Sequence, residues 1–354
     1  MLKISLGRYA LIYAGVTMGK PISIKDVAFR AGTSIATVSR ILNNVGYPIS
    51  EELRIRVEAA IRELGYRPNR MAQYLRSKQT QSIGLIVRDI SISYFSLIAK
   101  GVTDQAMARG LMPLVCSSKR TPFLEIEYLR LLAQHQVGGI IIAGAAWADD
   151  EYRKRLELTI ADLRAQDVRV IACAPHEVTM PCALVDNLDI GRQAFDVLHQ
   201  YGHNRIAILA GERTNLSNRL RVNGFIEEAN KAGAFYTLVE DDFFWERGYT
   251  ALATIFAEDP TITAIYAIND HIALGALRFL QESGRRVPEK VSVIGTGDVA
   301  VAPYTCPALS TIKIPFEELG ATAVNMIFDP KLAENTVLTF KCTYVERESV
   351  GPRP

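Results

Sequence analysis

Residues 23–43, SIKDVAFRAGTSIATVSRILN, decide the fold of the first part of this chain. Apolar residues recur at helical spacing on both sides of Ala31–Thr33, and Ser23 and Ser34 are suited to cap the two helices that follow them. A turn of only three residues around Gly32 makes two helices cross steeply. The stretch therefore predicts a helix-turn-helix.

A third helix is expected directly after this pair. Ser50 precedes Glu51 and Glu52, and a serine followed by acidic residues favours the start of a helix. Gly65 is suited to end it. The apolar stripe of this helix consists of Leu53, Val57, Ala60, Ile61 and Leu64. We expect a three-helix domain over residues 22–66.

Charge is distributed unevenly along the chain. The formal net charge of all 354 residues is only +2. Residues 18–78 contain eleven Lys/Arg and five Asp/Glu, a net charge of +6, and residues 1–17 add Lys3 and Arg8. Residues 79–354 contain 27 Lys/Arg and 33 Asp/Glu, a net charge of −6. A basic head on an acidic body is typical of nucleic-acid binding by the head.

The remainder of the chain alternates short apolar runs with amphipathic stretches. Runs rich in Val and Ile that alternate with amphipathic helices are typical of buried parallel strands. We therefore expect an α/β core with two similar lobes, each built on an open sheet of about six strands. The runs are SIGLIV (82–87), MPLVCSS (112–118), GGIIIAG (138–144), RVIACAP (169–175), RIAILAG (205–211), AIYAIND (264–270) and VSVIGTG (291–297).

Residues that directly follow these runs are the candidates for ligand binding, because open α/β sheets bind ligands beyond the carboxyl ends of their strands. The candidates are Asp89, Tyr94 and Phe95, Ala143 to Trp147, Asp186 and Asn187, Asn269 and Asp270, and Gly295 to Asp298. Trp147 lies in the loop after one of these runs and is a candidate for stacking on a ligand ring.

The N-terminal pattern resembles a known family of bacterial regulators. DVAFRAGTSIATVSR (26–40) and RVEAAIRELGYRPNRMAQYLRSKQ (56–79) are similar to the headpiece of the lactose-repressor (LacI/GalR) family. The resemblance implies that Ile35 and Ala36 read bases, through shape and thymine methyl groups, and that Arg40 contacts a base, often guanine. It also implies phosphate contacts for Ser34, Thr37, Ser39 and Asn43.

Residues 67–80 resemble the family's hinge, which becomes helical on the operator. This segment includes Asn69 and Arg70, and Ala72 and Leu75 match the minor-groove positions. The resemblance implies that Leu75 is a wedge that enters a base step and bends the DNA. A surface role in an ordinary linker is the alternative for Leu75.

The resemblance extends over the core, which is similar to sugar-repressor cores and to periplasmic sugar-binding proteins. It rests on GHNRIAILAGE (202–212), SNRLRVNGF (217–225) and PALSTIKIPFEELG (307–320). It implies that Arg221 and Asn269 hydrogen-bond an effector, that Phe243 stacks on it, and that Tyr94, Phe95 and Phe316 line the other lobe. Phe244 and Trp245 are alternatives to Phe243. A guanidinium and a carboxamide suit vicinal hydroxyls, and an aromatic face suits a sugar ring.

Three positions depart from the family pattern. Gly297 stands where the family commonly has an effector-binding aspartate, and Asp298 is the candidate substitute. Ala174 replaces a carboxylate and Ala143 a polar residue. The pocket is therefore expected to be less acidic than a typical sugar site. A sugar or related metabolite is the main effector hypothesis, and a purine or nucleoside is the alternative.

We expect a leader over residues 1–21, disordered or preceding a natural start at Met18, a helix-turn-helix domain over 22–66, a hinge over 67–80 and a core over 81–354. The first lobe is expected at about 81–185 plus 315–331, and the second at about 186–314 plus 332–354. Five scattered cysteines without a CxxC pair suggest reduced thiols. No run approaches the ~20 apolar residues of a membrane span. These features favour a cytoplasmic protein.

Other functions are less consistent with the sequence. VSVIGTGDVA contains part of a dinucleotide fingerprint, but Pro303 and Pro307 interrupt the helix that should follow. His199 and His203 have metal-like spacing without a third ligand nearby. We therefore expect no cofactor, no metal and no enzymatic activity. A secreted solute-binding protein would lack the headpiece, and an architectural DNA-binding protein would lack the acidic core.

The combined expectation is a homodimeric transcription regulator, a repressor rather than an activator, that binds a pseudo-palindromic operator in double-stranded DNA. A small-molecule effector, most simply a sugar, would bind between the lobes and shift the population of lobe angles. Both an inducer and a corepressor fit this scheme. The C-terminal ESVGPRP contains no heptads for a tetramerising coil.

Overall fold

The structure is a computed structural model that describes residues 22–42, 48–66, 82–212, 214–241 and 244–354. The chain divides into two units between Lys78 and Gln79, so that the predicted headpiece and the predicted core are separate bodies. Each unit is described by itself. No helix among the described residues has the length and apolarity needed to cross a bilayer.

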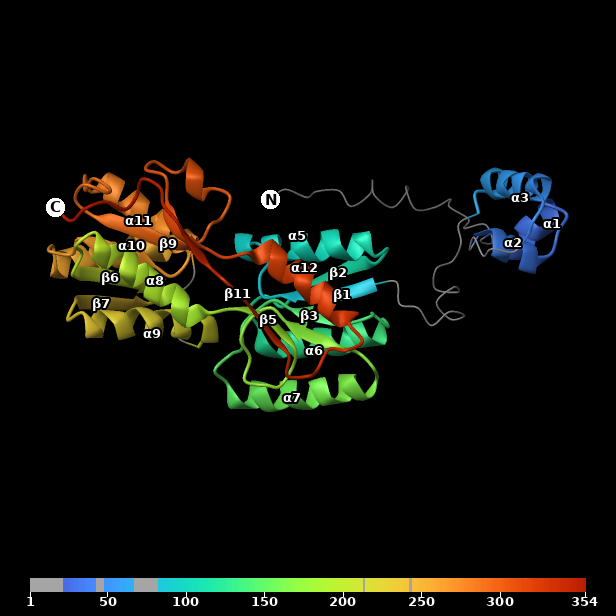
Figure 1. Ribbon diagram of the computed structural model, residues 1–354, viewed down its shortest axis with the longest axis horizontal. Helices are drawn as coiled ribbons and strands as arrows, with labels where there is room; N and C mark the ends of the chain where they lie inside the picture. Colours follow the sequence, from blue (N-terminus) through green and yellow to red (C-terminus); the bar gives the residue numbers. More distant parts are fainter. Residues whose placement is uncertain (1–21, 43–47, 67–81, 213, 242–243) are drawn as a thin grey trace, which may run out of the picture. The chain divides into compact units, whose positions relative to one another are not determined.

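Residues 22–42 and 48–66 contain three helices: α1 (Ile24–Arg30), α2 (Ile35–Leu42) and α3 (Glu51–Leu64) (Figure 1). Each contributes a fully buried valine, Val27, Val38 and Val57, to a common core. The predicted apolar stripe of α3 packs on this core. The sequence prediction of a three-helix domain is confirmed.

Local hydrogen bonds place the ends of these helices. The Ser23 amide and hydroxyl both donate to the Asp26 carboxylate, at 2.8 and 2.7 Å. The Ser34 hydroxyl accepts a hydrogen bond from the Thr37 amide at 3.1 Å, which satisfies one of the unpaired amides of α2. Gly32, in the turn between α1 and α2, has φ +62, a conformation that glycine adopts without strain.

The first lobe of the core contains a parallel sheet in the order β11-β5-β4-β3-β1-β2. Its strands are β1 (Ser82–Val87), β2 (Met112–Ser117), β3 (Ile140–Ile142), β4 (Val170–Ala172), β5 (Cys182–Val185) and β11 (Val337–Phe340). Strand β1 is buried on both faces. Leu85 packs into one apolar cluster and Ile86 into another, which explains the near-continuous apolar run in the sequence.

The second lobe contains a sheet in the order β12-β10-β9-β8-β6-β7, parallel except for β12. Its strands are β6 (Arg205–Ala210), β7 (Phe235–Glu240), β8 (Ala264–Ala267), β9 (Ser292–Gly297), β10 (Ser310–Lys313) and β12 (Thr343–Val345). The expectation of two sheets of about six strands is confirmed within the described part of the core. The seven apolar runs correspond to β1, β2, β3, β4, β6, β8 and β9.

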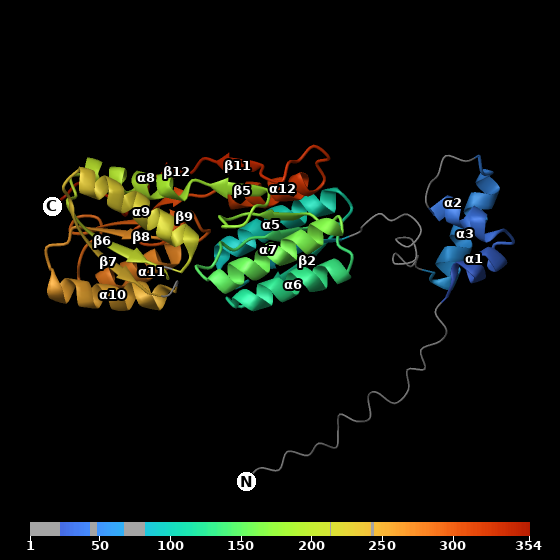
Figure 2. The ribbon, with the colours of Figure 1, turned by 90° about the horizontal axis from the view of Figure 1, so that it is seen from below.

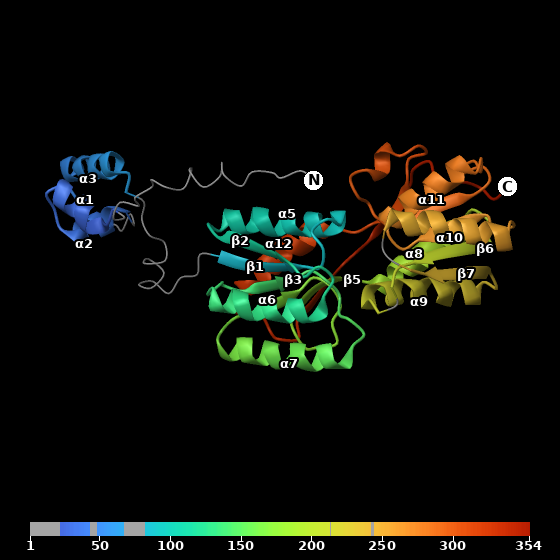
Figure 3. The same cartoon turned by 180° about the vertical axis from the view of Figure 1, so that it is seen from behind.

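Helices cover both faces of each sheet, giving two three-layered lobes. In the first lobe α5 (Ser93–Ala108) packs beside α12 (Phe316–Ile327), and α6 (Pro122–Gln134) beside α7 (Asp150–Ala165) on the opposite face (Figures 1 and 3). In the second lobe α8 (Asn187–Gln200) packs beside α9 (Leu216–Lys231). Helices α10 (Trp245–Glu258) and α11 (Asp270–Glu282) cover its other face (Figure 2).

The chain passes between the lobes three times, between β5 and α8, between β10 and α12, and between β11 and β12. The third passage corrects one predicted boundary. We expected residues 332–354 in the second lobe, but β11 pairs with β5 in the first sheet. Its outward residues, Val337 and Leu338, are exposed, because β11 is an edge strand. A short exposed strand has no buried apolar run by which sequence analysis could assign it.

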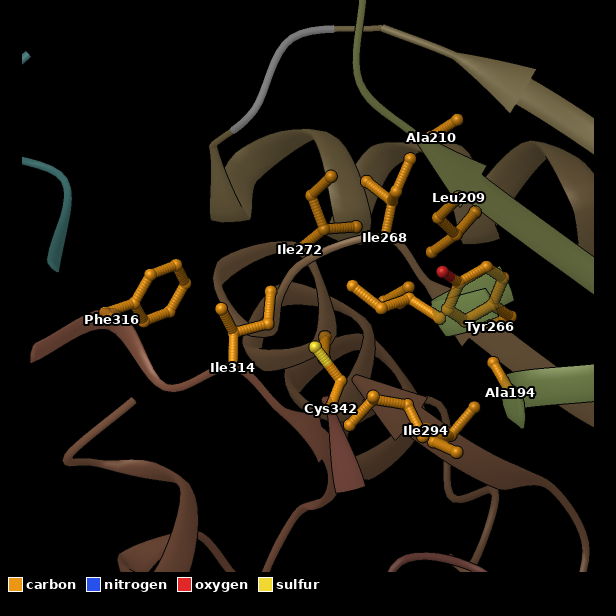
Figure 4. Close-up of a cluster of buried hydrophobic side chains, with 14 of the residues drawn as sticks. Ala194, Leu209, Ala210, Tyr266, Ile268, Ile272, Ile294, Ile314, Phe316 and Cys342 are labelled. Carbon is orange, nitrogen blue, oxygen red and sulfur yellow. The ribbon is translucent and has the colours of Figure 1, made fainter. Parts of the chain in front are cut away.

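A large apolar cluster extends through the core and reaches the junction of the lobes. Figure 4 shows part of it, with Tyr266 at one side and Ile314 and Phe316 at the other. Phe316 is the first residue of α12, directly after the second passage between the lobes. The packing of the second lobe is thus continuous with residues that connect it to the first.

His203 is a structural residue of the second lobe. Its ring is fully buried, with Nδ1 at 3.0 Å from the Thr263 hydroxyl and Nε2 at 3.0 Å from the Ser292 hydroxyl and the Gly351 carbonyl. This histidine therefore connects the start of β6 to the C-terminal segment. Its bonded neighbours are two hydroxyls and a carbonyl, so its described contacts are those of a structural histidine.

We predict that His203 makes the free energy of unfolding depend on pH below neutrality. Burial lowers the pKa of His203 below its ordinary value of 6.5, so the unfolded chain takes up this proton first as the pH falls. Stability contributed by neutral His203 is therefore present above pH 6.5 and is lost below it, by up to about 1.4 kcal/mol per pH unit. Denaturant unfolding between pH 7.5 and 5 measures this slope.

The matched variant is His203→Gln, which keeps a polar side chain but does not titrate in this range. We expect it to be less stable at pH 7.5 and to have a shallower pH slope than the wild type. Its remaining slope comes from other histidines, including His176 and His271, whose pKa values burial also lowers. An unchanged slope in His203→Gln would contradict the prediction.

Candidate functional site

The first candidate surface is the exposed side of α2 in the headpiece. Val38 and Ile41 face the core of this domain, whereas Ser34, Ile35, Ala36 and Arg40 are exposed. Thr37 and Ser39 are half-buried. No acidic residue occurs from Gly32 to Leu42 in this described stretch. The six headpiece residues predicted from sequence are thus on or beside one helix.

Ile35 is the first residue of α2 and 37% of its surface is exposed. An apolar side chain at the tip of a short helix, next to three serine or threonine hydroxyls, is suited to contact a partner with both methyl groups and anionic oxygens. Five further residues predicted to bind DNA, Asn43, Asn69, Arg70, Ala72 and Leu75, lie outside the described residues.

The second candidate site is a pocket between the two lobes of the core. It encloses about 750 Å³, including its open mouth. The first lobe contributes Tyr94, Ala143, Ala145, Cys173, Ala174 and Pro175 among others, and the second contributes Asn187, Asn215, Ser217, Asn218, Arg221, Asn269, His271 and Thr296 among others. Tyr94, Arg221, Asn269 and Phe316, four of the predicted effector residues, line this one pocket.

Several helices begin at this pocket because they follow the carboxyl ends of parallel strands. Asn187 is the first residue of α8, Asn215 is the N-cap of α9, and Asn269 is the N-cap of α11. Tyr94 and Phe316 lie in the first turns of α5 and α12. The amides of a helix N-terminus carry partial positive charge, so these ends favour hydrogen-bond acceptors in the pocket.

Arg221 lies on α9 and is fixed by two neutral partners. Its Nε donates to Asn187 Oδ1 at 2.9 Å and its Nη1 donates to the Ile268 carbonyl at 3.1 Å. The remaining nitrogen, Nη2, makes no hydrogen bond to a described residue, which leaves it available to a ligand. Two anchored nitrogens reduce the entropy that the side chain loses when it binds.

Asn269 and Asp270 have different roles. Asn269 Oδ1 accepts the Ile272 amide at 2.8 Å, so its carboxamide nitrogen is the group left for a ligand. The fully buried Asp270 carboxylate accepts from the Thr311 hydroxyl at 2.6 Å and the Val299 amide at 2.9 Å. Burial raises its pKa above the ordinary value. Asp270 thus joins α11 to the segment after β9 and to β10 itself.

The two aromatic residues of the pocket lie together. The rings of Tyr94 and Phe316 are 5.6 Å apart and inclined by 27°. Burial raises the pKa of Tyr94 to about 12, so its hydroxyl remains protonated and can donate a hydrogen bond at neutral pH. A planar ring or the apolar face of a sugar ring fits beside such a pair.

Four predicted effector residues are not placed in the lining. Phe95 is fully buried beside Tyr94, because it faces into the core from α5. Asp298, at φ +59, turns away and forms an ion pair with Arg347. The guanidinium of Arg88 lies 3.7 Å from the ring centre of Trp147 and covers it. Phe243 lies outside the described residues. Its alternatives, Phe244 and Trp245, are not among the lining residues either.

Sequence analysis missed several lining residues. Asn215, Ser217 and Asn218 surround the N-terminus of α9, and His271 follows Asn269 in α11. A signal was present for Asn215, because an asparagine shortly after the strand run RIAILAG and before an amphipathic stretch is a typical N-cap. Nothing in the local sequence distinguishes Ser217 or His271 from ordinary helix residues.

Contacts between the lobes flank the pocket. The Ala148 amide in the first lobe donates to the Thr214 carbonyl in the second at 2.9 Å, and Trp147 and Asn215 form an isolated antiparallel bridge. Arg120 and Glu212 form an ion pair at 2.9 Å across the same junction. These contacts hold the lobes together on the side of the pocket where the chain does not pass between them.

A buried polar group lies behind the first-lobe wall of the pocket. Glu125 accepts a hydrogen bond from the Tyr152 hydroxyl at 2.5 Å, and burial raises the pKa of this carboxyl. Arg88 donates to the Ala145 carbonyl, and His176 bonds the Gly144 carbonyl at 2.9 Å. Burial lowers the pKa of His176 to about 4, so it is neutral at pH 7. The bonds of Arg88 and His176 fix the loop that follows β3, whereas the Glu125–Tyr152 bond joins α6 to α7.

The two units match two family models. Residues 23–69 match the model described as bacterial regulatory proteins, lacI family. Residues 80–347 match the model described as periplasmic binding proteins and sugar binding domain of LacI family. The second match alone covers more than half of the chain, and together the two follow the division between headpiece and core.

The chain is also similar to curated proteins over most of its length. The HTH-type transcriptional repressor PurR of Pectobacterium carotovorum subsp. carotovorum is 33% identical over 339 residues, which is 94% of this chain and 98% of that protein. PurR of Pasteurella multocida is 32% identical over 337 residues, 94% of this chain and 99% of that protein.

Solved structures show the same architecture. The lac repressor dimer bound to operator and the anti-inducer ONPF has a TM-score of 0.84 at 29% identity, covering 94% of this chain and 100% of that one. The transcriptional regulator CelR–cellobiose complex has a TM-score of 0.67 at 28% identity, covering 93% and 99%. Both matches extend over headpiece and core.

We predict that Gly295 is required for the buried position of Asp270. A Cβ added at residue 295 would lie 2.3 Å from Asp270 Oδ1, within a fully buried hydrogen-bonded group. Gly295→Ala should therefore destabilise the core by about 2 kcal/mol or more, measured by denaturant unfolding.

Gly233→Ala is the matched control for this prediction. Gly233 has φ +65 and no atom within 4 Å of its added Cβ, so the substitution strains the backbone without a clash. Its expected cost is about 1 kcal/mol. If both variants lost the same stability, close packing against Asp270 would not be the reason for glycine at position 295.

Proposed function

Because this chain belongs to the lacI family of bacterial regulatory proteins, it is a DNA-binding regulator with a separate effector-binding core, and we propose that it acts as a transcriptional repressor controlled by a small molecule bound between the lobes. One observation carries this proposal. A helix-turn-helix with an exposed, acid-free second helix is joined in one chain to a two-lobed core with a pocket lined by polar and apolar side chains.

In the proposed DNA complex, α2 enters the major groove with its N-terminus first. Ser34, Thr37 and Ser39 contact phosphates, which orients the helix without reading sequence. Ile35 and Ala36 contact thymine methyl groups, and Arg40 donates to guanine acceptors. Asn43 and the hinge residues Asn69, Arg70, Ala72 and Leu75 extend the contact, with Leu75 as the minor-groove wedge.

We propose a homodimer that binds a pseudo-palindromic operator, since two helix-turn-helix units read half-sites about one helical turn apart. The solved lac repressor relative is described as a dimer bound to operator, which supports this assembly. A regulator of chromosomal genes acts in the cytoplasm. Neither a catalytic role nor a resident cofactor is part of the proposal.

The effector is proposed to act by population shift. A ligand that contacts both lobes stabilises one relative lobe orientation, and its differential affinity for the two orientations sets the size of the response. The first lobe follows the hinge in the chain, so lobe orientation is the property through which the pocket influences the two hinges of the dimer.

A sugar or related metabolite is the main effector hypothesis. The carboxamides of Asn187, Asn215, Asn218 and Asn269 and the Tyr94–Phe316 pair suit a hydroxylated ring. A purine or nucleoside is the second hypothesis, favoured by the PurR relatives at 32–33% identity. Amides and an aromatic pair are also suited to a planar base, so both classes belong in the first ligand screen.

We predict that Arg40→Ala weakens binding to an operator selected from random duplex DNA by the wild-type protein. Loss of a base contact by arginine should reduce specific affinity by about 5- to 150-fold, corresponding to 1–3 kcal/mol, with a much smaller effect on random DNA. Fluorescence anisotropy at fixed salt measures both affinities.

Arg56→Ala is the control, because Arg56 is an exposed arginine on α3 and its loss changes net charge by the same amount. It should leave the ratio of specific to nonspecific affinity nearly unchanged. A uniform loss of both affinities in Arg40→Ala, equal to that in Arg56→Ala, would remove Arg40 from base reading.

We predict that Tyr94→Ala separates effector response from DNA binding. A compound that binds the wild-type pocket at a hundred times its Kd adds about 2.7 kcal/mol of stability, which a thermal-shift screen detects. Loss of one ring of the aromatic pair should weaken this compound about tenfold. Operator affinity without the compound should stay the same. Phe123→Ala, an exposed aromatic of α6, is the control.

A further inference from the structure

We propose that the effector of this protein is an anion, a small molecule whose carboxylate or phosphate is bound by Arg221. This inference rests on the proposed function of the pocket and specifies the class of ligand. Its basis is the imbalance between charged donors and charged acceptors in the described lining of the pocket.

Arg221 faces the pocket with a guanidinium that no described carboxylate neutralises by a direct contact. Its partners are the Asn187 carboxamide and the Ile268 carbonyl, and both are neutral. Two other partly buried arginines of the core pair with acids, whereas Arg88 and Arg169 donate to backbone carbonyls. Arg347, whose side chain is 16% exposed, pairs with Asp298, and Arg120, 18% exposed, pairs with Glu212. A carboxylate or phosphate on the ligand would give Arg221 the negatively charged partner that Arg347 and Arg120 already have.

The described residues of the lining offer no available carboxylate to a ligand. Asp270 is the acidic residue among the lining residues, and both of its oxygens accept hydrogen bonds, from Thr311 and Val299. His271 also lines the pocket, and burial lowers its pKa, so it is neutral at pH 7. Without a charged acceptor, the site has little to attract a cation.

The neutral groups of the pocket add further donors. The Tyr94 hydroxyl is protonated and lies within the electrostatic influence of Arg221. Helices α8, α9 and α11 also begin at the pocket, and their N-termini favour negative charge.

These observations distinguish an anion from a neutral hydroxylated ligand. A hydroxyl must donate its own hydrogen as well as accept one, whereas a carboxylate or phosphate oxygen only accepts. The pocket presents a guanidinium, the Tyr94 hydroxyl and several helix ends as donors, so an acceptor-only group satisfies more of them. Sugar acids, sugar phosphates and nucleotides share this chemistry.

The test is a thermal-shift series on the full-length protein at constant ionic strength. The probes are glucose, gluconate and glucose 6-phosphate as one set, inosine and inosine 5′-phosphate as a second, and inorganic phosphate alone. We expect an anionic member of one set to raise the Tm at a concentration at which its neutral counterpart does not. Which set responds identifies the source of the anion.

Arg221→Gln is the diagnostic variant, and it should weaken the anionic compound about 30-fold or more, since hydrogen bonds to charged groups are the strong ones. Arg221→Lys keeps the charge and should retain the preference for the anion with reduced affinity. Arg192→Gln is the matched control, because Arg192 is a partly exposed arginine paired with Glu227 outside the pocket lining. It should bind as the wild type does.

Three outcomes would overturn the proposal. In the first, a neutral compound stabilises the protein as much as its anionic counterpart does. In the second, an anion stabilises the wild type and Arg221→Gln equally. In the third, no probe, inorganic phosphate included, gives a different Tm shift in the wild type and in Arg221→Gln. Operator binding measured on the same samples verifies that each variant is folded. If a neutral compound controlled operator binding, the proposed function would stand and this inference alone would fail.

Discussion

The arrangement of the core depends on one constraint: the parallel strands of both sheets end at the junction of the lobes. A parallel strand must be followed by a crossover helix, so the helices after these strands begin at the same junction. The first amides of each helix lack partners within the helix. A cavity surrounded by such helix ends is polar even apart from its charged side chains, and asparagine caps such as Asn215 and Asn269 are a local consequence of the same need.

The three passages of the chain connect the lobes on one side of the pocket, and noncovalent contacts connect them elsewhere. Arg120 and Glu212 are partly exposed, so their ion pair contributes little to stability by itself. The backbone contact between Trp147 and Asn215 is a single isolated bridge, so it also contributes little to stability. Such contacts can break and form again at a small cost in free energy. They therefore suit a junction at which a ligand is proposed to select one lobe orientation.

Sequence analysis predicted the elements that local pattern determines. The helix-turn-helix follows from helical spacing, caps and one glycine within about forty residues, and the buried strands follow from short apolar runs. Sequence analysis gave less information on which residues far apart in the chain lie together in the fold. Asp298 follows a strand run as a ligand residue should, yet its backbone at φ +59 directs it to Arg347, 49 residues further along the chain. Strand β11 was assigned to the wrong lobe because an exposed edge strand carries no burial pattern.

The pocket also contains groups that do not favour folding. The Arg221 guanidinium is partly removed from water with only neutral partners, and Nε2 of His271 has no partner among the described residues. Unsatisfied polar groups of this kind cost free energy in the folded protein. A ligand that satisfies them recovers that free energy on binding. Both groups belong to the second lobe, so such a ligand favours one lobe orientation only through its additional contacts with the first lobe, for example at Tyr94. The resulting difference in ligand affinity between lobe orientations limits how strongly any effector can regulate DNA binding.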